Sequence, residues 1–109
     1  MIPLDVSIRR NGGATTIAIS GELDLASVSA AREAVEQVVT SGEPIVLDLT
    51  GVGFIDSTGL GLIAFTAQQA GDRLTVIPSP VTRRLLDLTG MSDHLTLIVP
   101  EADDRAADD

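Results

Sequence analysis

The sequence predicts an α/β fold: a single small domain with a mixed, mostly parallel sheet, an N-terminal antiparallel hairpin and three to four helices. Two observations carry this prediction. Apolar segments with strand character alternate with segments of helical periodicity, which favours parallel strands joined by helical crossovers. Segment 45–49 (Ile-Val-Leu-Asp-Leu) is almost continuously apolar, which is typical of a central strand covered on both faces.

The hairpin at the start of the chain is predicted from a turn between two alternating segments. Apolar and polar residues alternate on both sides of Asn11-Gly12-Gly13. Asn-Gly favours a tight turn because both residues tolerate a positive φ. We therefore expect antiparallel strands near 4–10 and 14–20.

A first helix is predicted over about 26–40, because apolar residues recur there at helical spacing while charged residues occupy the opposite face. Its apolar face consists of Val28, Ala31, Val35, Val38 and Val39. Gly42 and Pro44 follow, and they end the helix because glycine suits a helix C-terminus and proline cannot continue a helix.

The rest of the chain continues the alternation of strand and helix. Ser79-Pro80 is a favoured helix start, because serine caps free N–H groups and proline has no N–H to leave unpaired. Helix 57–70 contains no charged residue, so it either packs deeply or presents an uncharged face to a partner. The elements expected after strand 45–49 are a loop at 50–56, a helix at about 57–70, a strand at 74–77, a helix from Pro80 that Thr89-Gly90 closes, and a last strand at 95–99.

Composition limits the classes of function. The 109 residues suffice for one domain. The chain has two Phe, no Tyr and no Trp, which predicts an aliphatic core and argues against stacking on nucleic-acid bases. Nucleic acid and anionic membranes would repel the net charge of −9. The expected partners are therefore proteins with basic patches, unless the acidity only keeps the domain soluble.

The charge also predicts a domain boundary. Residues 101–109 include five acids and one Arg, and they lack the large apolar groups that a folded segment buries. We predict a domain over 1–100 and a disordered acidic tail over 101–109.

The chain contains no Cys and no Lys. Disulfides, thiol nucleophiles and thiolate metal sites are therefore excluded, as are Schiff bases and the lysine of a nucleotide-binding loop. No segment has the apolar length of a membrane span, and no basic start precedes an apolar run as in a secretory signal. We expect a cytoplasmic protein without a cofactor or a metal, either a monomer or a weak dimer.

The most informative segment is 54–63 (Phe-Ile-Asp-Ser-Thr-Gly-Leu-Gly-Leu-Ile). Asp56 and Ser57 lie where the second helix should begin, and their oxygens can accept hydrogen bonds from its free N–H groups. Gly59 and Gly61 each cost a helix about 1 kcal/mol relative to alanine, which makes sense if another surface must approach a bare backbone. The simpler interpretation is that Asp56 or Ser57 is only a helix cap.

This segment also carries a resemblance. Residues 56–61 (Asp-Ser-Thr-Gly-Leu-Gly) resemble the signature of the STAS domain family and, within it, the bacterial anti-sigma factor antagonists. Segments 21–24 (Gly-Glu-Leu-Asp) and 83–90 (Arg-Arg-Leu-Leu-Asp-Leu-Thr-Gly) are similar to other recurrent segments of that family. The resemblance covers about residues 4–100 and implies a STAS-like fold. It also implies a regulatory binding module rather than an enzyme.

The resemblance implies that Ser57 is phosphorylated by a partner kinase, which is itself the anti-sigma factor, with Thr58 as the alternative site. The unphosphorylated protein would bind this anti-sigma factor serine kinase and free the sigma factor. Phosphorylation by ATP would end the binding, because a phosphoserine carries a charge of about −1.5 to −2, and a serine phosphatase would reset the switch. Asp24 and Asp56 would take part in docking the kinase or in making phosphorylation productive. The expected partner-binding residues are Asp24, Asp56, Ser57, Thr58, Gly59, Gly61 and Leu62.

Other functions compete with this one. The same fold suits a scaffold or a ligand-sensing subunit of a stress-signalling assembly without a phosphoswitch. Asp48 and Asp56 are expected near the carboxyl ends of parallel strands, but a receiver-like phosphoryl site would need an acid cluster and a lysine, so Asp48 is expected to bond to turn N–H groups. A hydrolase would have to combine Ser57 with His94, the single histidine, which is expected to be a solvated loop side chain.

Overall fold

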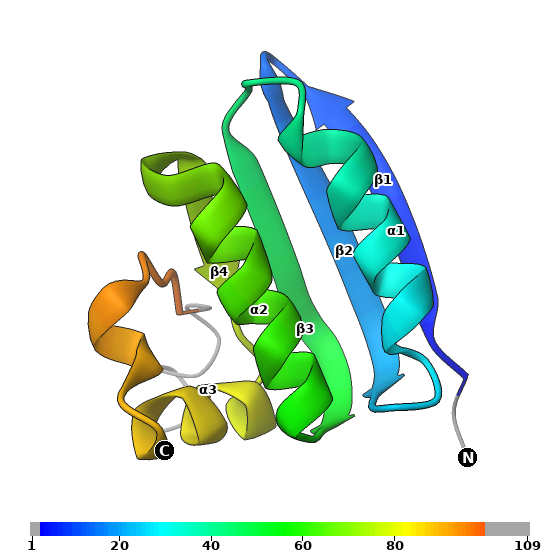
Figure 1. Cartoon of the computed structure of the whole chain (residues 1–109), viewed down its shortest axis with the longest axis vertical. Helices are drawn as coiled ribbons and strands as arrows, with labels where there is room; N and C mark the ends of the chain where they lie inside the picture. Colours follow the sequence, from blue (N-terminus) through cyan, green and yellow to red (C-terminus); the bar gives the residue numbers. More distant parts are fainter. Residues whose placement is uncertain (1–2, 100–109) are drawn as a thin grey trace, which may run out of the picture.

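The computed structural model describes residues 3–99 and confirms the α/β fold with a mixed sheet (Figure 1). The four strands follow one another across the sheet in chain order. The first pair is antiparallel and the other two pairs are parallel, as predicted. The strands are β1 (Asp5–Asn11), β2 (Ala14–Leu23), β3 (Ile45–Ile55) and β4 (Leu74–Ile77). The predicted tail 101–109 lies outside the described residues.

Two long helices lie side by side over one face of the sheet, and a third lies crosswise near one end of it (Figure 1). They are α1 (Val28–Val39), α2 (Ser57–Ala70) and α3 (Pro80–Leu88), and two short 3-10 turns, η1 (Gly71–Arg73) and η2 (Met91–His94), complete the described chain. None of the helices within residues 3–99 combines the length and the apolar character that a bilayer crossing requires.

The core is aliphatic, as the lack of aromatic residues predicts. Ile17, Leu47 and Val76 lie in register across three neighbouring strands and are fully buried. Val35 of α1 and Ile63 of α2 are also fully buried. Burying a side chain of this size contributes about 1.5–3 kcal/mol, so this row of residues holds the two helices against the sheet.

The predicted hairpin is confirmed. Asn11 pairs with Ala14, and the two residues between them, Gly12 and Gly13, have φ of 63° and 88°. Two successive positive φ angles define a type I′ turn, which matches the twist of paired strands.

The loop predicted at 50–56 is wrong, because β3 continues to Ile55 and pairs with β2 as far as Leu23. The pairing of β2 with β3 shifts register near Gly51. A Cβ at Gly51 would lie 2.6 Å from the Cβ of Ser20, so only glycine lets the two strands come this close. Gly51 and Gly53 therefore lie inside a strand and not in a loop.

The expectation that strand 45–49 is covered on both faces is also wrong in part. Its residues alternate between buried and half-buried, and Val46 and Asp48 are half-buried. Because Asp48 lies within the longer β3, it is not at the carboxyl end of the strand beside Asp56. Its carboxylate accepts hydrogen bonds from the backbone N–H of Thr50 at 3.0 Å and from the Thr50 hydroxyl at 2.8 Å, which confirms its structural role.

The last strand predicted at 95–99 is reduced to a single parallel bridge between Val76 and Leu97. Two hydrogen bonds hold it: the N–H of Val76 to the carbonyl of Thr96 at 2.9 Å, and the N–H of Ile98 to the carbonyl of Val76 at 3.0 Å. β4 has only four residues and is followed by Pro78, which cannot donate to a ladder. The edge is therefore too short for a fifth full strand.

Candidate functional site

The candidate site lies where β2 and β3 end next to each other. Leu23 pairs with Ile55, and an aspartate directly follows each of them in the chain. The N–H of Asp56 donates to the carbonyl of Leu23 at 3.3 Å, and the N–H of Leu25 donates to Oδ2 of Asp56 at 3.3 Å. The loops that carry Asp24 and Asp56 are thus joined at the carboxyl edge of the parallel strands, where open α/β sheets place their sites.

Asp56 is the N-cap of α2, so the capping interpretation holds for this residue. Its Oδ1 accepts hydrogen bonds from the N–H groups of Thr58 at 2.9 Å and Gly59 at 3.3 Å, and from the Thr58 hydroxyl at 2.5 Å. These bonds, above all the one from the Thr58 hydroxyl, hold the pKa of the Asp56 carboxyl below its ordinary value, while its partial desolvation acts the other way. Asp56 is therefore a carboxylate at neutral pH.

Replacing Asp56 by asparagine is expected to make the thermal stability less dependent on pH in the acid range. The pKa of Asp56 in the folded protein lies below its ordinary value of 3.8, so folding favours the carboxylate. This stabilisation is complete above the ordinary value and is lost as the pH falls through the folded value. Thermal unfolding followed from about pH 7 to about pH 3 should show a smaller loss of Tm for Asp56→Asn than for the wild type. Parallel curves would contradict this assignment.

Asp24 organises the loop before α1. Its Oδ1 accepts hydrogen bonds from the N–H of Ala26 at 3.1 Å and from the hydroxyl of Ser27 at 3.2 Å. The Ser27 hydroxyl also donates to the carbonyl of Glu22 at 2.7 Å. Two carboxylates, one from each loop, therefore border the entrance of α2.

Ser57 and Thr58 differ in how available their hydroxyl groups are. Ser57, the first residue of α2, is exposed, and its hydroxyl has no hydrogen-bond partner among the described residues. Thr58 is half-buried and its hydroxyl is held by Asp56. Of the two candidate phosphoacceptors, only Ser57 thus presents a free hydroxyl to an incoming group.

The two glycines of the motif serve different purposes. Gly59 is buried, and a Cβ there would lie 2.7 Å from Cγ1 of Ile55 and 2.9 Å from Cγ of Leu23. Gly61 is exposed, and a Cβ there would meet nothing within 4 Å. Leu62 is also buried, only 2 % exposed. A bare backbone that another surface can approach is therefore found at Gly61, while Gly59 lets α2 pack closely on the ends of β2 and β3.

Two apolar side chains beside the carboxylates escaped the sequence analysis. Leu25 is 75 % exposed and Phe54 is 49 % exposed. Together with Asp24, Ala26 and Asp56 they line a shallow hollow of about 490 Å³. Their positions in the sequence could have identified them, because Leu25 directly follows Asp24 and Phe54 lies two residues before Asp56.

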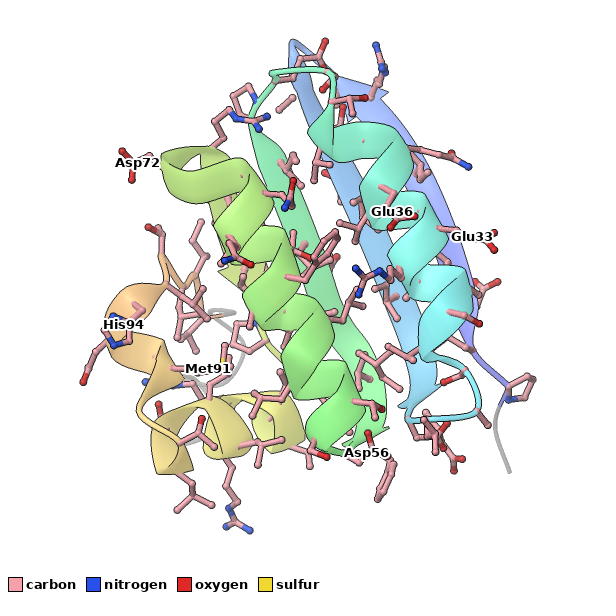
Figure 2. The ribbon with its side chains drawn as sticks, in the orientation of Figure 1. Glu33, Glu36, Asp56, Asp72, Met91 and His94 are labelled. Carbon is pink, nitrogen blue, oxygen red and sulfur yellow. The ribbon has the colours of Figure 1, made fainter. Side chains whose placement is uncertain are left out.

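Nothing described around Ser57 resembles a hydrolytic site. His94 lies in η2, and Figure 2 shows it well away from Asp56, the residue that precedes Ser57 at the start of α2. Within residues 3–99, no group of three or more side chains is placed to hold a metal ion. The site therefore offers a free hydroxyl, two carboxylates and an apolar hollow, which together suit the docking of a protein better than the turnover of a small substrate.

Comparison with known proteins identifies the family of the chain. A family model described as "Mlab, STAS domain" matches residues 6–100. The chain belongs to the STAS domain family. Two of the three segments that resemble the family meet at this site, since 21–24 lies at the end of β2 and 56–61 at the start of α2, whereas 83–90 lies in and after α3.

Several proteins similar to the chain are named anti-sigma factor antagonists. The anti-sigma-F factor antagonist RsfB of Mycobacterium tuberculosis is 33 % identical over 98 residues, which cover 86 % of this chain and 80 % of RsfB. The crystal structure of an anti-sigma factor antagonist from Mycobacterium paratuberculosis superimposes with a TM-score of 0.83 at 30 % identity, covering 95 % of this chain and 92 % of that one. The Bacillus cell fate determinant SpoIIAA in its phosphorylated form shares the fold, with a TM-score of 0.68 at 21 % identity over 94 % of this chain and 99 % of that one.

Proposed function

We propose that this STAS domain is an anti-sigma factor antagonist switched by phosphorylation of Ser57. Unphosphorylated, it binds an anti-sigma factor serine kinase and thereby frees the sigma factor. The kinase transfers the γ-phosphate of ATP to the Ser57 hydroxyl and the complex dissociates, and a serine phosphatase removes the phosphate. The observation that carries the proposal is the exposed, unengaged Ser57 hydroxyl at the start of α2.

The surface around Ser57 has the character of a protein interface. The exposed Leu25 and Phe54 provide apolar area that binding can bury, and buried apolar and aromatic side chains dominate the energy of most interfaces. Asp24 and Asp56 frame this area with negative charge. The partner surface is therefore expected to combine an apolar contact with basic side chains, which fits the net charge of −9 on this chain.

A phosphate on Ser57 would add negative charge to an edge that already carries two carboxylates. The N–H groups of Thr58 and Gly59 already donate to Asp56, so these donors of the first helical turn are not free to receive the phosphate. A group with a charge of about −1.5 to −2 would then lie next to the carboxylate of Asp56, on the same edge as Asp24. A partner covering it would have to desolvate this charge, which costs several kcal/mol without a matching cation.

The same phosphate is expected to leave the fold intact, because Ser57 is exposed and its side chain supports no described contact in the core. The phosphorylated form of SpoIIAA, which has the same fold, supports this expectation, because it is a phosphorylated protein with this architecture. The switch therefore acts on the interface and not on the stability of the domain.

The proposal is tested by phosphate transfer. The purified chain is incubated with its partner anti-sigma factor kinase and radiolabelled ATP, and the modified residue is mapped by mass spectrometry. We expect one phosphate per chain, carried by Ser57, abolished in Ser57→Ala and retained in Thr58→Val. Phosphate on Thr58 would overturn the site. Tight binding without any transfer would favour a scaffold that lacks a phosphoswitch.

A further inference from the structure

The outer edge of β1 has no partner among the described residues. β1 is the first strand of the sheet order and pairs only with β2. Figure 1 shows it at the side of the sheet remote from α2 and β4. All its residues except the half-buried Val6 are exposed, including Ile8 at 42 %. A free edge of seven residues presents unpaired N–H and C=O groups that can pair with another strand.

The hairpin turn determines which backbone groups face this edge. In a two-residue turn, the flanking pair, here Asn11 and Ala14, exchanges hydrogen bonds. Such pairs recur at every second residue of an antiparallel ladder. The N–H and C=O groups of Val6 and Ile8 therefore point away from β2, toward the free edge. The residues whose backbone groups point toward β2 are Asp5, Ser7 and Arg9.

The side chains of β1 are complementary to those of a second, antiparallel copy of β1. When two copies of β1 run antiparallel with Ser7 opposite Ser7, Asp5 of each copy faces Arg9 of the other, and Val6 faces Ile8. The outward backbone groups of Val6 and Ile8 then meet each other, as a ladder requires. Opposite charges and apolar pairs directly across two strands are both stabilising.

We propose that β1 pairs with β1 of a second copy of this chain, in this register, to form a symmetric dimer with one continuous sheet. The other registers allowed by the backbone lose this match. With Ile8 on the two-fold axis, Val6 would face Arg10 and Asp5 would face Asn11. With Val6 on the axis, Asp5 would face Ser7. Only the register centred on Ser7 pairs both charges and both apolar side chains.

The dimer leaves the phosphorylation site open. The paired edge lies beyond β2, whereas α2, which begins at Ser57, lies over the half of the sheet near β3 and β4 (Figure 1). Arg10 at the end of the strand is 3.7 Å from Glu43 of its own chain, so its charge is partly balanced within the protomer. The net charge of −9 per chain opposes association at low ionic strength, which makes the dimer weak and reversible.

Single cysteines test the register, because the chain has none of its own. In Ser7→Cys, the two thiols lie across a pair with Cα atoms about 4.5 Å apart, within the range of a disulfide. In the control Asp5→Cys, the two thiols are offset by four residues along the strands, which separates their Cα atoms by about 13 Å. Oxidation with diamide should cross-link Ser7→Cys at least about tenfold faster than Asp5→Cys and Ile8→Cys. Equal rates, or faster cross-linking of Ile8→Cys, would overturn the proposal.

Charge reversal tests the pairing without a covalent bond. Sedimentation equilibrium should show that Asp5→Arg and Arg9→Asp each weaken dimerisation at least about tenfold, because like charges then face each other. The double variant Asp5→Arg/Arg9→Asp should recover the wild-type affinity within about threefold. A double variant as weak as the single ones, or a wild type that stays monomeric at millimolar concentration, would overturn the proposal. Phosphate transfer to Ser57 should be the same in all of them, so a failure here is separate from a failure of the proposed function.

Discussion

Replacing Ser57 by aspartate is expected to weaken binding of the partner anti-sigma factor kinase at least about tenfold, equivalent to about 1.4 kcal/mol. The added carboxylate lies at the exposed start of α2, directly after the carboxylate of Asp56, where the proposed partner would cover it. Its effect should be smaller than that of a phosphate, because it carries one negative charge and not two. Replacing Ser57 by alanine removes only an unengaged hydroxyl, so Ser57→Ala should bind within about twofold of the wild type.

Isothermal titration calorimetry with the kinase, in the absence of ATP, measures these affinities. The matched control is Gln68→Glu, which adds one negative charge to an exposed position of the same helix, about 16 Å along its axis from Ser57. It should bind like the wild type. If the control loses as much affinity as Ser57→Asp, the effect reports overall charge, and Ser57 does not lie in the interface.

Replacing Gly59 by alanine is expected to destabilise the domain by about 1–3 kcal/mol, despite the better helix propensity of alanine. The new Cβ would lie 2.7 Å from Cγ1 of Ile55, 2.9 Å from Cγ of Leu23 and 3.0 Å from the carbonyl oxygen of Leu23. That carbonyl also accepts the N–H of Asp56, so the strand end cannot move away without loosening the site. The clash therefore costs both packing and the junction between the two loops.

The neighbouring glycine is the natural control. A Cβ at Gly61 would meet nothing within 4 Å, so Gly61→Ala should stabilise the domain by up to about 1 kcal/mol through helix propensity alone. Urea unfolding of the two variants should give shifts of opposite sign. Equal stability of both variants would mean that α2 does not pack on the ends of β2 and β3 as the structure shows.

The fold could be predicted from local patterns wherever one residue type has one structural meaning. Asn11-Gly12-Gly13 predicts a tight turn because few other sequences allow two positive φ angles, and the valines of α1 recur at a spacing that only a helix places on one face. The prediction failed at Gly51, where glycine has two meanings. It marks a loop in most sequences, but here it marks a strand pressed against Ser20. The prediction of a last strand at 95–99 was wrong because the length of that strand depends on β4, the neighbouring strand with which it pairs.

The sequence of residues 54–63 by itself determined that a capping aspartate is followed by a serine and a helix. A helix start of this kind depends only on backbone dihedral angles and on hydrogen bonds within a few residues. Which hydroxyl is free, which glycine is buried and which apolar side chains remain in solvent were decided only when β2 came to lie beside β3. That pairing brought Leu23 under Gly59 and Asp24 beside Asp56, and it left Leu25 and Phe54 exposed. These differences in exposure arise from contacts between segments about 30 residues apart in the sequence, so local sequence patterns cannot predict them.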